Sequence, residues 1–337
     1  MRRVHLDQVP WLEWSSPNKT FHGTGQQISE ALGAVTNAPL HAGGHPFDLE
    51  RGRLLPGKSG CPFHSHSAQW ELFVILQGTG MVRFGKQRRD VTAGDVILYP
   101  PGAPHQLVNT GATALEYYLI TDNPLTEFWQ YPDSNKWGHR PGGACFRRQE
   151  VNYWLDEESD APAEEPAVAS PEPSPPDAHA RFVSIGSIPW EHRMSPKGRY
   201  SSRCRDISLA LGGVRNAGLS AGGHPFDLQI RRVPPGAAIC PFHSHAAQWE
   251  LFVFREGRGV VRSGDERLKV GPGDVVLHPP GVPHQTMAHP DAELECWIIA
   301  DNPPVDVFHY PESNKWGLRP PGKYFRMTEV DYFDGEE

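Results

Sequence analysis

Residues 61–74 read Cys-Pro-Phe-His-Ser-His-Ser-Ala-Gln-Trp-Glu-Leu-Phe-Val, and residues 240–253 repeat them with a single change, Ala246 for Ser67. The same offset of 179 positions relates Pro10-Trp11 to Pro189-Trp190, and Ser134-Asn-Lys-Trp-Gly138 to the matching stretch that begins at Ser313. The repeated unit is far longer than the roughly 20–50 residues of solenoid repeats. The sequence therefore predicts one domain written twice.

The composition favours an all-β fold. The chain of 337 residues contains 34 Gly and 34 Pro with 21% charged residues, which is typical of many short strands joined by turns. Strands are expected at 71–77, 81–84, 95–99 and 115–120, and helix only in short pieces at 27–32 and 124–128.

A linker rich in Pro, Ala and Glu separates the copies. We expect an N-terminal domain at 1–156, an exposed acidic linker at 157–179 and a C-terminal domain at 180–337. Residues 156–179 carry eight acids and no Lys or Arg, which accounts for the whole net charge of −8.

Several classes of protein are excluded by these features. The absence of a basic stripe argues against nucleic-acid binding. No apolar run approaches the length of a membrane span, and the N-terminus lacks the apolar core of a signal peptide. Five cysteines without a Cys-x-x-Cys pair are typical of reduced thiols. We expect a cytoplasmic protein without membrane contact, and a homo-oligomer is left open.

The repeated stretch has the residue types of a metal site. His64 and His66 are two positions apart, so on a strand their rings project from one face. Glu71 begins the next apolar strand, and His105 follows a rigid turn at 100–104. Three imidazoles and a carboxylate suit Fe, Mn, Zn, Ni, Co or Cu, whereas Ca and Mg prefer oxygen ligands. Iron is our first expectation.

The chain resembles the cupin superfamily. Its first motif, Gly, then His-x-His, Glu and Gly, is matched by His64, His66, Glu71 and Gly78, and the second motif by Gly94, Pro100, Gly102, His105 and Asn109. The second copy matches the same positions, except that Ala288 replaces the closing Asn; Gly57 and Gly236 also lie one residue further from the first His than usual.

The resemblance implies two tandem double-stranded β-helix (jelly-roll) barrels, a bicupin, with a metal site in each barrel. The implied metal ligands are His64, His66, Glu71, His105, His243, His245, Glu250 and His284.

Other residues are weaker candidates for chemistry. Gln69 and Gln248 could hydrogen-bond a substrate or pack a loop. Tyr99, Asp133 and Glu312 could donate a proton to a substrate. Segments 131–138 and 310–317 could be lids, or arms that hold the two barrels together. For two further pairs of residues we favour packing over a role in the site: Cys61/Cys240 and His45/His224.

Positions that differ between the copies suggest divided roles. Tyr99 corresponds to His278, Tyr117 to Cys296 and Tyr118 to Trp297. If these aromatic changes face the barrel interior, the two pockets accept different ligands.

Three functions remain open. The first is a metal-dependent oxygenase (an oxidoreductase of the dioxygenase type) acting on a small oxygenated organic molecule, and the second is a non-oxidative decarboxylase, lyase or sugar isomerase with Mn or Zn. The third is a small-molecule-binding protein without turnover.

Overall fold

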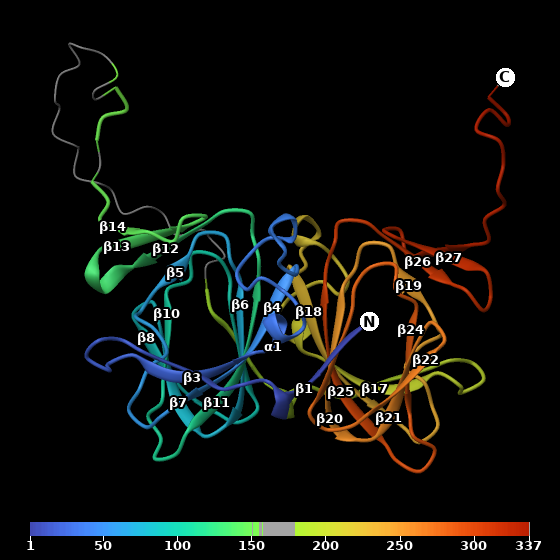
Figure 1. The fold of residues 1–337 in the computed structure, drawn as a ribbon, viewed down its shortest axis with the longest axis horizontal. Helices are drawn as coiled ribbons and strands as arrows, with labels where there is room; N and C mark the ends of the chain where they lie inside the picture. The colour runs from blue at the N-terminus through green and yellow to red at the C-terminus, as the bar shows by residue number, and fades with distance from the viewer. Residues whose placement is uncertain (150, 155–156, 158–178, 337) are drawn as a thin grey trace.

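The computed structural model describes residues 1–149, 151–154, 157 and 179–336, and it consists of two β-barrels side by side (Figure 1). The expected all-β fold is confirmed. Among the described residues, the first copy contains fourteen strands: β1 Arg2–His5, β2 Leu12–Ser15, β3 His22–Gln27, β4 Phe47–Leu54, β5 Ser65–His66, β6 Glu71–Gln77, β7 Thr79–Phe84, β8 Gln87–Thr92, β9 Asp95–Tyr99, β10 His105–Val108, β11 Leu115–Asp122, β12 Glu127–Tyr131, β13 Lys136–Arg140 and β14 Cys145–Phe146. The second copy repeats them: β15 Arg181–Ser184, β16 Glu191–Met194, β17 Ser201–Asp206, β18 Phe226–Val233, β19 Ser244–His245, β20 Glu250–Gly257, β21 Gly259–Ser263, β22 Glu266–Val270, β23 Asp274–His278, β24 His284–Ala288, β25 Leu294–Asp301, β26 Asp306–Tyr310, β27 Lys315–Arg319 and β28 Lys323–Phe325.

Each barrel combines one large sheet with two small ones. In the first barrel the large sheet has the order β15-β9-β6-β11-β4-β3-β2, and the small sheets are β10-β7-β8 and β14-β13-β12-β5. Backbone hydrogen bonds between His64 and His105, with N–O distances of 3.1 and 2.7 Å, join the two small sheets. The second barrel repeats this arrangement, with the matching bonds between His243 and His284.

The large sheets are apolar on both faces. On β6, Phe73 and Ile75 pack inside the first barrel, whereas Leu72 and Val74 join a cluster shared by the two copies. That shared cluster includes Leu251 and other residues of the second copy's large sheet. Two buried faces explain why the strands read as continuous apolar runs and not as an alternating pattern.

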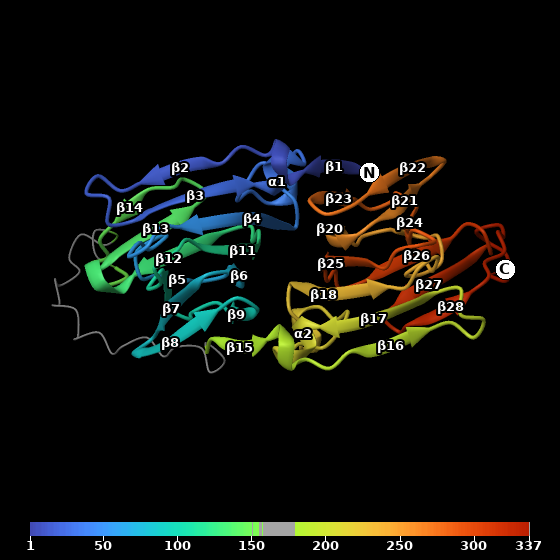
Figure 2. The same ribbon diagram turned by 90° about the horizontal axis from the view of Figure 1, so that it is seen from below.

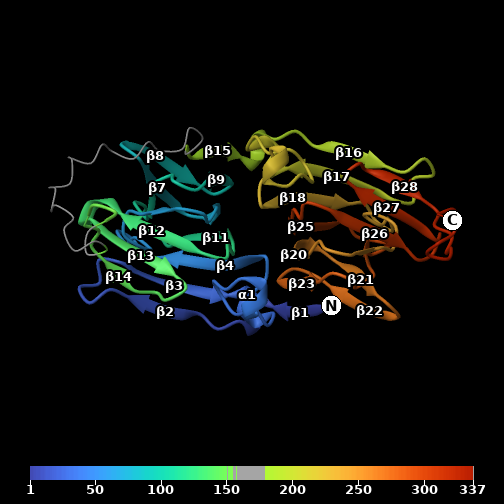
Figure 3. The ribbon, with the colours of Figure 1, turned by 90° about the horizontal axis from the view of Figure 1, so that it is seen from above.

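The two barrels exchange their first strands. Strand β1 pairs antiparallel with β23 of the second copy, and β15 pairs antiparallel with β9 of the first copy. Figures 2 and 3 show β1 beside β23 and β15 beside β9, at opposite edges of the molecule. Each large sheet therefore ends in a strand supplied by the other copy. The predicted boundaries at 156 and 180 stay a prediction, and most of the predicted linker lies outside the described residues.

Helices are short. The helix expected at 27–32 corresponds to α1 Ile28–Ala31, repeated as α2 Ile207–Ala210. The remaining helical turns are of the 3-10 type: Leu6–Gln8, Leu40–Ala42, Pro132–Ser134, Ile185–Ser187 and Leu219–Ala221. Among the described residues, no helix has the length and the apolar character needed to cross a membrane.

The helix expected at 124–128 is wrong, because Glu127 begins strand β12. The fully buried Glu127 carboxylate accepts hydrogen bonds from the backbone N–H groups of Ser67, Ala68 and Gln69 at 2.8–2.9 Å. These bonds, and the pairing of Trp129 with His66, hold the segment extended against β5.

Candidate functional site

The structure brings the four predicted ligands of the first copy together. Ligand atoms of His64, His66 and Glu71 all lie within 4.8 Å of one another, and His105 Nε2 lies 2.6 Å from a Glu71 oxygen. His64 directly precedes β5 and His66 ends it, Glu71 begins β6 and His105 begins β10. Three different strands therefore supply one cluster.

Two of the three imidazoles are oriented by hydrogen bonds on their outer nitrogens. His64 Nδ1 donates to the Pro62 carbonyl and His105 Nδ1 to the Ala103 carbonyl, both at 2.9 Å. His66 Nδ1 lies 3.4 Å from Glu127, and its buried Nε2 makes no hydrogen bond. Fixing Nδ1 in this way leaves Nε2 as the free donor atom, which is the usual support of a histidine that binds a metal.

The second copy repeats this cluster. Ligand atoms of His243, His245 and Glu250 lie within 4.8 Å of one another, and His284 Nε2 lies 2.7 Å from Glu250. His245 Nδ1 is held at 2.6 Å by Asp306, which stands at the position of Glu127. Both donor sets fit a divalent transition metal. That these residues are its ligands stays a prediction.

The carboxylates of the clusters are held ionised. Burial alone raises the pKa of Glu71, but the neighbouring imidazoles His66 and His105 hold it well below its usual range. The pKa of Glu250 is depressed in the same way by His284 and His245. Each cluster therefore offers an anionic oxygen near neutral pH.

The first cluster faces a cavity of about 490 Å³. Its wall is largely apolar and aromatic, with Trp14, Phe73, Leu107, Tyr117, Leu119 and Trp129 among the lining residues. Glu50 of β4 lines the same cavity. Burial raises the pKa of Glu50, the Gln27 side chain hydrogen-bonds the carboxylate and opposes the rise, and the charges of Glu71 and Asp48 add to it. The cavity thus holds a metal-type cluster and a buried carboxyl group whose pKa is raised.

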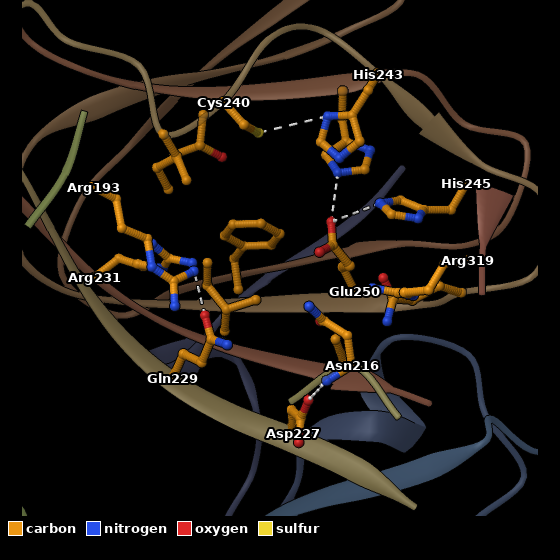
Figure 4. A pocket seen from close by; sticks show the side chains of 17 residues that line it. Arg193, Asn216, Asp227, Gln229, Arg231, Cys240, His243, His245, Glu250 and Arg319 are labelled. Atoms are coloured by element: carbon orange, nitrogen blue, oxygen red, sulfur yellow. Dashed lines mark hydrogen bonds and ion pairs between the residues drawn. The ribbon is translucent and has the colours of Figure 1, made fainter. Parts of the chain in front are cut away.

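The second cavity, of about 300 Å³, has the opposite charge character (Figure 4). Three arginines line it, Arg193, Arg231 and Arg319, where the first cavity has only Arg140 among its described lining residues. Gln229 stands at the position of Glu50, so the second cavity has no counterpart of that carboxyl group.

Two predicted proton donors lie away from the cavities. Asp133 is paired with Arg83 at 2.6 Å and Glu312 with Arg262 at 2.5 Å. The two carboxylate side chains are 57% and 46% exposed and line neither cavity. They lie at the turns of the hairpins β12–β13 and β26–β27.

The interpretation of these hairpins as arms between the barrels is wrong. They stand at the two outer ends of the molecule, far from the contact between the barrels (Figure 1). Each hairpin instead pairs with a short strand of its own barrel, β5 or β19. The first hairpin supplies Trp129, Tyr131 and Arg140 to the lining of its cavity, and the second supplies Arg319.

The remaining candidates have structural contacts. The Tyr99 ring stacks on His105 with centroids 3.9 Å apart and does not line the cavity. Gln69 and Gln248 line the cavities but also donate to the backbone carbonyls of Asp122 and Asp301, at 2.7 and 2.6 Å.

Of the two residue pairs for which packing was favoured, the histidines are packed between the barrels and the cysteines line the cavities. His45 and His224 are buried between the barrels. The ring centroids of His45 and Trp249 are 5.0 Å apart, and those of His224 and Trp70 are 5.4 Å apart. Cys61 and Cys240 line the cavities. All five thiols are free.

Sequence reasoning missed Glu50, Glu127, Arg231 and Asp306. The signal for Glu50 and Arg231 was available in part, since charged residues alternate with apolar ones over part of their strands. Aligning the two copies also shows both differences: Glu50 corresponds to Gln229, and Gly52 corresponds to Arg231.

Comparison with known proteins agrees with this geometry. A family model described as a cupin domain matches residues 51–121 and again 229–300. The oxalate-binding protein of Thermotoga maritima is 34% identical over 70 residues, which are 21% of this chain and 57% of the relative. The dimethylsulfoniopropionate lyase DddQ of Ruegeria pomeroyi is 34% identical over 81 residues, 23% of this chain and 40% of the relative. The chain thus spans about half the length of the curated relatives it matches.

Similarity to solved structures extends over most of the chain. A variant of oxalate decarboxylase from Bacillus subtilis superposes with a TM-score of 0.52 at 16% identity, covering 91% of this chain and 79% of that protein. At this identity the likeness concerns the fold, and it includes both barrels.

Proposed function

The chain is a bicupin, a member of the cupin superfamily with two cupin domains, and we propose that its first barrel is the catalytic one, performing a non-oxidative, metal-dependent bond cleavage. The substrate class is a small oxygenated organic molecule. The observation that carries this proposal is Glu50, a carboxyl group with a raised pKa in the cavity that also contains His64, His66, Glu71 and His105.

Each part of the first cavity has a defined task in this proposal. His64, His66, Glu71 and His105 hold a divalent metal, which when bound supplies Lewis acidity toward a substrate oxygen. The aromatic wall excludes water and positions the carbon skeleton.

Glu50 holds the proton. A carboxyl with a raised pKa keeps its proton to a higher pH than an ordinary one; it donates that proton to the atom left negative when a bond breaks and then recovers one from water. Gln229 cannot do this, so the second barrel lacks a proton donor at this position. The similarity to a lyase supports the reaction class, and the similarity to an oxalate-binding protein supports a small oxygenated ligand.

The test compares Glu50→Gln with wild-type protein on a panel of small hydroxy, keto and carboxylic acids, with and without oxygen. We expect turnover without oxygen, and a roughly 10²–10⁴-fold loss in Glu50→Gln at unchanged metal content, the usual contribution of a general acid. Asp133→Asn, on the exposed hairpin, serves as the control and should retain full activity. Full activity in Glu50→Gln would contradict the assigned role.

An oxygenase is the second candidate, supported by the largely apolar wall of the first cavity, which would admit O2 together with an aromatic substrate. It predicts that product formation consumes O2 and stops under strict anaerobiosis, whereas the first proposal predicts the same rate with or without oxygen.

A further inference from the structure

We propose that the cavity of the second barrel is a binding site for a small organic carboxylate, which is held by the guanidinium groups of Arg231 and Arg193. This proposal concerns the second cavity alone and does not depend on the reaction proposed for the first. It rests on three observations. Arg231 is a buried cation without an anionic partner, two paired positions have changed together between the copies, and part of the cavity wall is apolar.

Arg231 is a buried cation whose partners are neutral. Its side chain is on the inner face of β18, and the residue is only 9% exposed. Nη2 donates to the Gln229 side-chain oxygen at 2.8 Å and Nη1 to Ser202 Oγ at 3.2 Å, while the buried Nε has no hydrogen-bond partner. Among the described residues, no carboxylate forms an ion pair with it. An uncompensated buried charge is costly, and an anion in the cavity would remove that cost.

A second guanidinium lies next to the first. Figure 4 shows Arg193 and Arg231 extending together into one side of the cavity, opposite His243 and His245. Arg193 is held only loosely by acids, with Glu191 at 3.5 Å and Asp206 at 3.9 Å, and its side chain is 32% exposed. Arg231 has no acidic partner among the described residues and Arg193 has only long contacts with acids, so the two neighbouring cations form a receptor for an anion.

The first copy has exchanged both arginines for uncharged residues. Trp14 stands at the position of Arg193, and Gly52 at that of Arg231. In the first barrel Gly52 pairs directly with Tyr117, whose ring lies so close that a Cβ at Gly52 would come 2.2 Å from Cζ. In the second barrel the same pair is Arg231 and Cys296. The small Cys296 leaves the space that Tyr117 fills in the first barrel, so the two positions have changed together.

The cavity wall selects among anions. Ile239, Phe252 and Ile298 line the cavity together with the arginines, so part of a bound ligand faces apolar side chains. Its volume of about 300 Å³ suits a small molecule. The planar fork of a guanidinium matches a carboxylate, and the apolar wall favours an organic skeleton over inorganic phosphate.

The test is calorimetric titration of the full chain with acetate, succinate and benzoate, with inorganic phosphate and neutral succinamide as comparisons. We expect one site per chain for at least one of the carboxylates, and weaker or absent binding of phosphate and succinamide. Arg231→Gln and Arg193→Gln should each weaken the binding roughly tenfold to hundredfold, the usual loss for a charge-assisted hydrogen bond. Arg258→Gln, an exposed arginine of the second copy that lines neither cavity, should leave it unchanged.

Several results would overturn the proposal. They are binding of none of the three carboxylates, equal binding of phosphate, unchanged affinity in both arginine variants, or loss of affinity in Arg258→Gln. Binding that both arginine variants keep but that disappears when the metal is removed would assign the anion to the metal alone. Should the buried Arg231→Gln fail to fold in a thermal melt, the more exposed Arg193→Gln and the charge-conserving Arg231→Lys provide the same comparison.

Discussion

Glu50 and Gln229 occupy the same position of the two copies, and they differ by a single titratable group. Glu50 lies on the inner face of β4 and Gln229 on the inner face of β18, so each points into its own cavity. One substitution therefore removes a titratable carboxyl group from this position of the second cavity.

The proton on Glu50 gives the activity a pH dependence of known sign. Its pKa is raised above the ordinary value of 4.5, so the acid form persists above that pH and is lost as the pH rises through the raised pKa. We expect kcat to be highest on the acidic side and to fall as the pH rises. The residual kcat of Glu50→Gln should not show this fall as the pH rises. A rate that rises with pH through the same range in wild-type protein would argue against an acid role.

The metal clusters predict a stoichiometry. Elemental analysis of protein purified without added metal should find about two metal ions per chain if both donor sets are filled. His66→Ala and His245→Ala should each reduce the content toward one, because each removes one ligand from one cluster. Asp306→Asn, which withdraws the charge that orients His245, should weaken metal binding at the second site by roughly 10–100-fold. Loss of both ions from either histidine variant would mean that the clusters are not independent.

At the level of single residues, the sequence predicted the eight side chains that form the two clusters, but not all of the residues that line the cavities or contact the clusters. The His-x-His spacing and the Pro-rich turn identify eight side chains that the structure places in two clusters. Glu50 and Arg231 escaped because both faces of their strands are buried, so periodicity does not indicate which face lines a cavity. Glu127 and Asp306 escaped because their partners lie about 60 positions away along the chain.

At the level of secondary structure, the two copies exchange their first strands, β1 and β15. Val4 of β1 packs against the cluster shared by the barrels, and Arg3 donates to Asp274 at 2.7 Å. In return, Phe182 of β15 packs against the interior cluster of the first barrel. The sequence could not reveal this, because equivalent strands of two similar barrels have the same pattern whichever barrel they join.

Removal of β1 should affect the barrel that is distant in sequence. Deleting residues 1–5 exposes the edge of β23, so amide hydrogen exchange should accelerate in 274–278 and much less in β9, residues 95–99. The N-terminal barrel keeps its own edge strand β15 and serves as the internal control. Faster exchange confined to 95–99 would contradict the pairing.

At the scale of the whole molecule, the contact between the barrels is a hydrophobic core. The two large sheets bury a shared cluster with Phe47 and Phe226 at its centre, their ring centroids 6.4 Å apart. The cross-contacts of His45 with Trp249 and of Trp70 with His224 flank it symmetrically. The barrels therefore share their stability.

A core substitution on one side should destabilise both barrels. Phe226→Ala creates a cavity at a residue that is 1% exposed, and should lower the free energy of unfolding by about 3–5 kcal/mol. Because the cluster is common to both copies, denaturant unfolding should remain a single transition in probes of either barrel. The exposed Val305→Ala should change stability little, within about 0.5 kcal/mol. Two separate transitions in wild-type protein would show that the barrels are independent.

The exchanged strands also bear on the history of the gene. Losing either copy would strip an edge strand from the survivor and expose half of the shared core, so selection would act against reversing the duplication. The second copy is retained for its structural duty whatever happens to its pocket. Its cavity was thus free to diverge without loss of the protein, which is consistent with the different residues that line the two cavities.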